Sequence, residues 1–268
     1  MCGRYASSRK PEDLAELFGA SVRDPTEALA ADWNIAPTKP VHAVLERPLK
    51  GDAKGDGNGN GNGDGPVRQL RTLRWGLVPS WAQSPDVAVK MFNARSETVH
   101  EKPAYRRSFA ARRCLIPADG YYEWVVPPAA AGTPKSRVRK QPYFITPADG
   151  SVMAMAGLYE FWRDPGRTAD DPQAWRATCT VVTTAAEPAL AHIHPRMPLV
   201  LRPEAYDDWL DPTLTEPALA RALLVPPPPG LMEVRPVSAA VGSIRNNGPE
   251  LVLPARPEPA AEGGGTLF

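Results

Sequence analysis

The sequence predicts an α+β fold with antiparallel sheet, and three observations support this prediction. Many short segments are rich in β-branched and aromatic residues, which is typical of strands. Short helical segments lie between them at irregular intervals, without the regular alternation of βαβ units. No internal repeat is found, so a repeat architecture is not expected.

The first predicted helix is KPEDLAELFGA, near the amino terminus. Pro11 suits the first turn of a helix, acidic residues follow it, and Gly19 can terminate it. Four further short helices are expected, in PAYRRSFAARR, PALAHI, PEAYDDWL and TEPALARALL.

Strands are expected in VHAVLER, LRTLRWGLV, PYFIT, VMAMAGLYEFW and ATCTVVTTA, and in RCLIPADGYYEWVV with a turn at Asp119–Gly120. Residues 51–65 are rich in Gly and Asn, and residues 127–141 are Pro-rich and basic, so both are interpreted as hairpin insertions. Each doubling of such a loop costs only about 0.6 kcal/mol of closure entropy. We therefore expect one domain over residues 1–254, followed by a disordered tail over residues 255–268.

Length and composition fit an ordinary globular protein. The chain has 268 residues, of which 43% are hydrophobic and 23% charged, enough for a sizeable core. No apolar run reaches the roughly 18 residues that a membrane span needs, and no signal peptide is recognised. The sequence therefore predicts a cytoplasmic protein without membrane association.

The cysteines and histidines are few. The three cysteines, Cys2, Cys114 and Cys179, argue against a disulfide scaffold. His192 and His194 could ligate a metal, but no further ligand stands at a suitable spacing, so no metal site is expected.

The charge is unevenly distributed. Residues 1–140 contain 22 Lys and Arg against 15 Asp and Glu (+7), and residues 141–268 contain 9 against 15 (−6), which sum to the net +1. A basic half is typical of proteins with an anionic partner such as nucleic acid. The alternative is a solvated surface of mixed sign.

The chain opens with MCGRYASS. A small second residue permits removal of Met1, and the processed chain would then begin with Cys2, with an α-amine and a thiol on adjacent carbons. The alternative is that a cysteine stands here by chance.

Nine strings together carry a resemblance. They are MCGRYA, WNIAPT, RWGLVPSWA, FNARSETV, RRCLIPADGYYEW, AGLYEFW, TTAA, HPRMPLVL and VGSIRNNGPEL, and they extend from Cys2 to about Pro254. In this order they resemble the SRAP (SOS-response-associated peptidase) family. Its members shield abasic sites in single-stranded DNA by becoming covalently attached to them.

The resemblance implies a single domain with a largely antiparallel, barrel-like core flanked by short helices. It also implies a role in the DNA damage (SOS) response, with abasic single-stranded DNA as the partner and no cofactor. We further expect a monomer that meets the replication machinery and is nucleoid-associated when bound to DNA.

The residues themselves support this chemistry. A ring-opened abasic sugar presents an aldehyde, which an amine converts to a Schiff base. A neighbouring thiol then closes a thiazolidine, and Cys2 as first residue would supply both nucleophiles with a high effective molarity. The α-amine has an ordinary pKa near 7.7–8.0, so roughly a quarter of it is neutral near pH 7.5. We expect nearby cations such as Arg4 to lower the pKa of the thiol.

The resemblance assigns active-site roles to three further residues. Glu123 is the expected acid–base group, His194 the expected proton donor to the ribose oxygen, and Asn93 the expected ligand of the α-amine or a sugar hydroxyl. The structural alternatives are a strand carboxylate with an ion-pair partner, a histidine that caps a turn, and an asparagine that holds a loop.

DNA contacts are expected from Arg4, Arg95 and Arg196 on phosphates, with Trp75 as a stacking surface or, alternatively, a core residue. WNIAPT is expected to form a loop beside the site, in which Asn34 and Pro37 have structural roles.

Three other functions remain open. An amidohydrolase with an amino-terminal cysteine nucleophile would also begin Met-Cys-Gly, but it gives no role to FNARSET and HPRMP. A peptidase could remove Met1 from its own chain with the same acid–base groups. A non-catalytic nucleic-acid-binding module would bind reversibly, with strong salt dependence and no need for Cys2.

Overall fold

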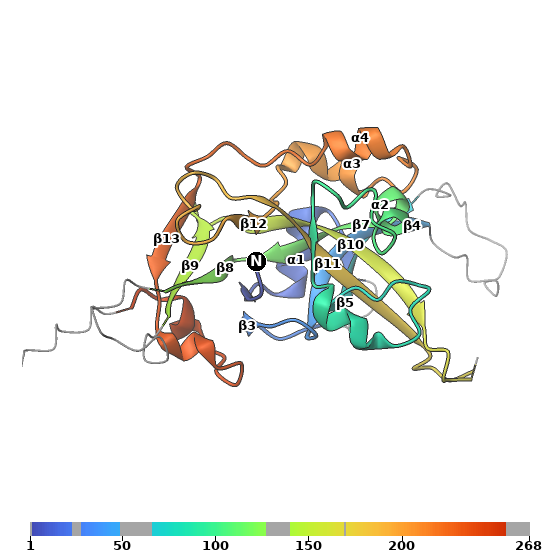
Figure 1. Ribbon diagram of the computed structural model, residues 1–268, viewed down its shortest axis with the longest axis horizontal. Helices are drawn as coiled ribbons and strands as arrows, with labels where there is room; N and C mark the ends of the chain where they lie inside the picture. Colours follow the sequence, from blue (N-terminus) through green and yellow to red (C-terminus); the bar gives the residue numbers. More distant parts are fainter. Residues whose placement is uncertain (1, 23–27, 49–65, 127–139, 169, 256–268) are drawn as a thin grey trace, which may run out of the picture.

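The computed structural model describes residues 2–22, 28–48, 66–126, 140–168 and 170–255 (Figure 1). Within these residues the chain forms two β-sheets with short helices around them. In the view of Figure 1, β13, β9 and β8 lie on the left, and helices α3 and α4 lie above β10 and β11. This arrangement confirms the predicted α+β class.

The larger sheet closes on itself. Its strands follow the order β12-β11-β10-β7-β4-β5-β2, and β11 also pairs with β5 in parallel, which joins β11, β10, β7, β4 and β5 into a ring. The remaining pairs of the ring are antiparallel. The bounds are β2 (Ser21–Val22), β4 (Pro40–Pro48), β5 (Pro66–Trp75), β7 (Arg113–Ala118), β10 (Met153–Arg163), β11 (Trp175–Ala185) and β12 (Arg196–Pro198).

The alternation of side chains explains why this ring is stable. In β4, Val41, Ala43 and Leu45 join the interior core, whereas Val44 packs outward with Leu14 of a helix. Successive side chains of a strand point to opposite faces, so each strand of the ring contributes to two apolar layers. The predicted barrel-like core is confirmed.

The second sheet is open and has the order β13-β9-β8-β1-β3. Its strands are β1 (Tyr5–Ser7), β3 (Asp32–Ile35), β8 (Gly120–Val125), β9 (Gln141–Pro147) and β13 (Met232–Pro236), all antiparallel to their neighbours. The short β6 (Asn93–Arg95) pairs with β11 of the other sheet.

The chain passes from one sheet to the other between β7 and β8. A turn was predicted at Asp119–Gly120 within a continuous pair of strands, but β7 and β8 belong to different sheets. A Cβ atom at Gly120 would lie 2.6 Å from the Ile145 carbonyl oxygen and closer still to the ring of Phe144. Glycine at this crossing therefore permits a close approach that a larger residue would prevent.

The helices are short and cover the outer layer. They are α1 (Pro11–Phe18), α2 (Arg106–Ala111), α3 (Tyr206–Leu210) and α4 (Pro217–Ala222), with 3₁₀ turns η2 (Pro85–Lys90), η4 (Pro203–Ala205), η5 (Ala239–Gly242) and η6 (Pro249–Val252). As predicted, Pro11 begins α1 and Gly19 ends it in a left-handed conformation. PALAHI was predicted as a helix, but this segment forms consecutive turns.

Both predicted hairpins have strands at their bases. Pro48 lies opposite Pro66, and Val125 lies opposite Gln141. Most of the proposed insertions 51–65 and 127–141, and the proposed tail beyond residue 255, lie outside the described residues, so their predicted disorder and the domain limits remain predictions. Among the described helices, none is long and apolar enough to cross a membrane.

Candidate functional site

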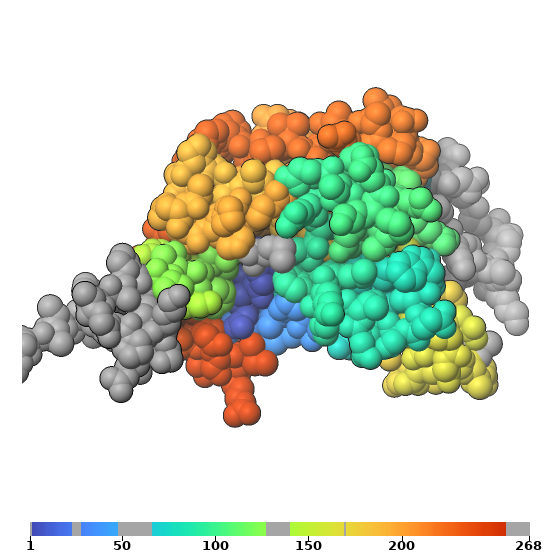
Figure 2. Space-filling view, viewed as in Figure 1, coloured from blue at the N-terminus to red at the C-terminus, as the bar shows by residue number. Residues whose placement is uncertain are grey.

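The amino-terminal segment leads Cys2 into the middle of the molecule. Tyr5 lies opposite Tyr121 in the pairing of β1 with β8, and the N–H of Tyr122 donates to the carbonyl oxygen of Arg4 at 2.9 Å. The same antiparallel direction brings Cys2 beside Glu123. In Figure 2 the dark-blue amino-terminal residues lie at the centre of this face, between amber, teal and orange-red segments. Distant parts of the chain therefore meet around Cys2.

Cys2 is fully buried in the chain that carries Met1, with 0% exposure. Burial and the negative charge of Glu123 raise the pKa of the Cys2 thiol well above its usual range. Arg4 was expected to lower this pKa; its contact with the thiol is through the Arg4 carbonyl oxygen, 4.0 Å from Sγ, and the lowering from that contact is outweighed by burial. The thiol is therefore protonated at neutral pH in this state.

Asn93 holds the backbone of Cys2. It begins β6, which pairs in parallel with β11 at Val181. Its Nδ2 donates to the Cys2 carbonyl oxygen at 2.7 Å. Its Oδ1 is buried and has no hydrogen-bond partner among the described residues. This buried oxygen can accept a hydrogen bond beside the residue that would bear the reactive amine.

Glu123 and His194 are brought together from β8 and from the turn before β12. Glu123 is 6% exposed. Burial raises the pKa of the Glu123 carboxyl, while nearby positive charge, including that of His194, opposes the shift. A carboxyl with a raised pKa can both accept and donate a proton near neutral pH, which suits an acid–base group.

The orientation of His194 follows from its backbone contacts. The N–H of Arg196 donates to His194 Nδ1 at 3.0 Å. The carbonyl oxygen of Arg196 lies 3.1 Å from the same Nδ1 atom, so the tautomer decides whether Nδ1 donates or accepts. The backbone of Arg196 therefore holds the orientation of the imidazole ring.

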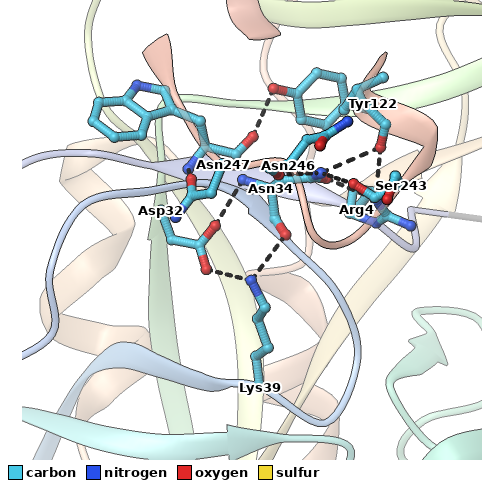
Figure 3. Close-up of polar contacts among 10 residues, drawn as sticks. Arg4, Asp32, Asn34, Lys39, Tyr122, Ser243, Asn246 and Asn247 are labelled. Atoms are coloured by element: carbon cyan, nitrogen blue, oxygen red, sulfur yellow. Dashed lines mark hydrogen bonds and ion pairs between the residues drawn. The ribbon is translucent and has the colours of Figure 1, made fainter. Parts of the chain in front are cut away.

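Arg4 belongs to a polar network that ties the carboxy-terminal part of the chain to β3 (Figure 3). Its Nη1 donates to Asn34 Oδ1 at 2.7 Å and to the Val241 carbonyl oxygen at 2.9 Å. Asn34 is completely buried, and its Nδ2 lies 2.8 to 3.2 Å from the carbonyl oxygens of Val241, Ser243 and Asn246. Arg4 is therefore held by protein acceptors.

WNIAPT was predicted to form a loop, but Asn34 lies in β3. Asp32 extends the network, because it accepts from the Asn34 N–H at 2.8 Å and pairs with Lys39 at 2.6 Å. The structural role expected for Asn34 agrees with these contacts. Two segments meet here that lie far apart in the sequence, residues 32–39 and 241–247. No local sequence pattern predicts this contact.

The two other arginines differ in their surroundings. Arg95 ends β6 and is exposed, so it can reach a phosphate. Arg196 begins β12, and both Nη atoms donate to the carboxylate of Glu97. Glu97 belongs to FNARSET but was not among the residues predicted to act in the site.

Trp75 is not a stacking surface. It is 0% exposed, its Nε1 donates to the Phe92 carbonyl oxygen at 2.8 Å, and its ring packs edge-on against Tyr5 at a centroid distance of 5.1 Å. The core alternative is correct for this residue. Trp81, six residues later in RWGLVPSWA, is 60% exposed. It lies in the segment that leaves β5 and returns to Asn93 at β6.

The other two cysteines are buried and free. Burial raises the pKa of both the Cys114 and the Cys179 thiols. They are unreactive core residues at neutral pH. Among the described residues no group of three or more His, Cys, Asp or Glu is arranged to hold a metal ion.

Comparison with known proteins gives consistent matches. The family profile described as SOS response associated peptidase (SRAP) matches residues 1–244. The abasic site processing protein YoqW of Bacillus subtilis (strain 168) is 34% identical over 252 residues, which cover 94% of this chain and 99% of that protein. The abasic site processing protein YedK of Escherichia coli (strain K12) is 30% identical over 260 residues, 95% of this chain and 100% of that protein.

A longer relative matches in part. The abasic site processing protein HMCES of Xenopus tropicalis is 34% identical over 207 residues, 68% of this chain and 56% of that protein. A crystal structure of a Bacteroides thetaiotaomicron protein has a TM-score of 0.71 at 24% identity and covers 95% of this chain and 100% of that one. The last comparison confirms the fold, and the profile and sequence matches together show that the chain belongs to the SRAP (SOS response associated peptidase) family.

Proposed function

We propose that this protein processes abasic sites in single-stranded DNA by forming a thiazolidine crosslink through Cys2 after removal of Met1. The observation that carries the proposal is the convergence of four groups from separate strands and turns: Cys2 beside Glu123, His194 near Glu123, and Asn93 bonded to the Cys2 backbone. The relatives named abasic site processing proteins support the substrate class.

The proposed reaction has two stages. The neutral α-amine of Cys2 adds to the aldehyde carbon of the ring-opened sugar, and loss of one water gives an imine. The thiol then adds to the imine carbon, so that a C–S bond forms and the nitrogen receives the thiol proton. The product is a five-membered ring, and the net change is the loss of one water molecule.

Three side chains have roles in these stages. His194 donates a proton to the sugar oxygen as the ring opens. Glu123 transfers protons during carbinolamine dehydration and receives the thiol proton before passing it to nitrogen. Asn93 orients the amine, because its Nδ2 fixes the Cys2 carbonyl and its Oδ1 can accept from the amine.

Removal of Met1 is a separate hydrolysis, in which water attacks the Met1 carbonyl carbon and the Cys2 nitrogen leaves as an amine. Glu123 is placed to assist this step as a general base. Self-processing of this kind is part of the proposal and has a test of its own. In the absence of other aminopeptidases, a Glu123→Gln protein should retain Met1.

The DNA-binding surface is proposed to combine positive charge with an aromatic side chain. Arg95 is exposed on β6, and the exposed indole of Trp81 replaces Trp75 as the stacking surface. Stacking of a base on an aromatic ring contributes about 1 to 3 kcal/mol and tolerates any sequence. Such contacts suit a protein that meets damage at arbitrary positions, as a monomer near the replication machinery.

The test compares a processed protein carrying a carboxy-terminal tag with a protein that retains one extra residue before Cys2. Both are incubated with uracil-containing single-stranded DNA and uracil glycosylase, and adducts are counted on denaturing gels. The free terminus should give a heat-stable band, with the sugar on Cys2 by mass spectrometry. The extended protein should give none, because an amide nitrogen cannot form an imine. Equal adduct formation by both proteins would refute the proposal, and glutaminase activity without adducts would support an amidohydrolase.

A further inference from the structure

The strongest unassigned feature is the contact between Arg196 and Glu97. Both Nη atoms of Arg196 donate to the two carboxylate oxygens of Glu97, one at 2.9 Å. Nη2 also donates to the Thr183 carbonyl oxygen at 2.6 Å. A planar guanidinium binds a carboxylate and a phosphate in the same two-point geometry. Glu97 therefore occupies the edge of Arg196 that a DNA phosphate would use.

Exposure shows which partner faces solvent. The side chain of Arg196 is 16% exposed, whereas that of Glu97 is 50% exposed. The Nε atom of Arg196 is buried and has no hydrogen-bond partner among the described residues. Because the remaining edge of the guanidinium is buried, a phosphate cannot bind Arg196 in the two-point geometry without replacing Glu97.

Neighbouring strands place Glu97 between two cations. Arg95 lies opposite Thr183 on one side of β11, and Arg196 lies opposite Ala185 on the other. The hydrogen bond from Arg196, and to a lesser degree the charge of Arg95, lower the pKa of the Glu97 carboxyl. Glu97 is thus ionised at neutral pH and reduces the local charge from +2 to +1.

We propose that Glu97 determines specificity by occupying Arg196 in the free protein, so that DNA phosphates bind there only by displacing its carboxylate. The inference rests on the proposed function. Displacement weakens reversible binding to intact and abasic strands alike, but the crosslink makes capture of abasic DNA permanent. Release from intact DNA is therefore faster, and less protein is held on undamaged strands.

The experiment uses Glu97→Gln, with Glu101→Gln as the matched control. Glu101 is an exposed acidic residue that pairs with His100 Nε2 at 3.1 Å. Binding to an intact single-stranded oligonucleotide is measured by fluorescence anisotropy across a series of salt concentrations. Glu97→Gln should lower Kd about fivefold relative to the control, since a charged hydrogen-bonding partner no longer competes. The slope of log Kd against log salt should be the same for both variants, because the same phosphate is neutralised once the Glu97 carboxylate has been displaced.

A double-mutant cycle separates competition at Arg196 from a general charge effect. In an Arg196→Gln background, Glu97→Gln should produce no tightening beyond that of Glu101→Gln. The inference is overturned if Glu97→Gln leaves Kd equal to that of the control, if it weakens binding, or if the tightening persists without Arg196.

A parallel assay keeps this inference distinct from the proposed function. The unsubstituted protein is tested for a heat-stable adduct with abasic single-stranded DNA. An adduct together with an unchanged Kd for Glu97→Gln would reject the role of Glu97 alone. Absence of any adduct would reject the proposed function, whatever the binding results.

Discussion

Replacement of Asn34 by leucine tests whether the network in Figure 3 holds the carboxy-terminal segment in place. Leucine has the same number and branching of side-chain heavy atoms and no polar atom, so the shape of the side chain is roughly kept while the hydrogen bonds are lost. Asn34→Leu removes the contact with Arg4 at 2.7 Å and the two shorter contacts with carbonyl oxygens, at 2.9 Å to Ser243 and 2.8 Å to Asn246.

The magnitude follows from what each partner retains. The Val241 oxygen keeps its bond from Arg4 at 2.9 Å, and the Ser243 oxygen keeps its bond from the Asn246 N–H at 3.2 Å. Because these two carbonyl oxygens keep a partner, no full desolvation penalty is added for them. Three lost hydrogen bonds at about 1 kcal/mol each then lower the free energy of unfolding by about 3 kcal/mol. That is a large fraction of the roughly 5 to 15 kcal/mol of a typical domain.

Urea unfolding monitored by tryptophan fluorescence measures the effect. Asn246→Ala is the control, because among the described residues its exposed side chain donates one hydrogen bond, from Nδ2 to the Ala240 carbonyl oxygen at 2.8 Å, and its backbone oxygen is unchanged. The free energy of unfolding of the control should fall by about 1 kcal/mol or less. Asn34→Leu should also be cleaved faster by trypsin after the exposed Arg245. A loss for Asn34→Leu no greater than for the control would refute the anchoring role.

Four further outcomes are expected. Burial raises the pKa of Glu123 above its ordinary value of 4.5, so ionisation of this carboxyl destabilises the folded state as pH rises. Glu123→Gln should therefore have a higher Tm than the parent at pH 8 and the same Tm near pH 4. A difference in Tm that does not change with pH would contradict this. Trp81→Ala should weaken binding to single-stranded DNA about tenfold without lowering Tm. Trp75→Ala should lower the free energy of unfolding by about 3 to 5 kcal/mol. The reverse pattern would restore Trp75 as the stacking surface. Replacing residues 51–65 by a four-residue turn should preserve crosslinking and add about 1 kcal/mol to the free energy of unfolding, measured in urea. Loss of adducts by the folded variant would show that the insertion has a function. Cys2→Ser should give an adduct that survives denaturation only after borohydride reduction, and a stable adduct without reduction would show that the thiol is dispensable.

Local patterns were sufficient where the local physics decides the structure. Pro11 and Gly19 predict both ends of α1, and the apolar alternation in VHAVLER and LRTLRWGLV predicts β4 and β5. By contrast, β1, β6 and β12 have three residues each, too few for a periodic pattern. Their pairing depends on strands far away in sequence, as does the parallel contact of β5 with β11 that closes the ring.

The candidate site shows the same division. The motifs indicated Cys2, Asn93, Glu123 and His194, and these residues lie near one another in the structure. The motif RWGLVPSWA contains two tryptophans, and the buried Trp75 was assigned to DNA in place of the exposed Trp81. Extending the alternation of β5 from Leu73 would have placed Trp75 in the interior. No comparable signal existed for Glu97, because its contact with Arg196 joins residues 99 positions apart.

The electrostatics of the site favour an order for the proposed reaction. In the chain that carries Met1, burial and Glu123 raise the pKa of the Cys2 thiol, so a thiolate is disfavoured in that environment. An α-amine, by contrast, is substantially neutral near pH 7.5 without any shift. Attack by the amine therefore comes first, and the resulting iminium ion places a positive charge next to Cys2. That charge stabilises a developing thiolate, and Glu123 can then accept the thiol proton. A buried thiol is thus compatible with crosslinking, and it also limits oxidation and side reactions of Cys2 while the protein is free of DNA.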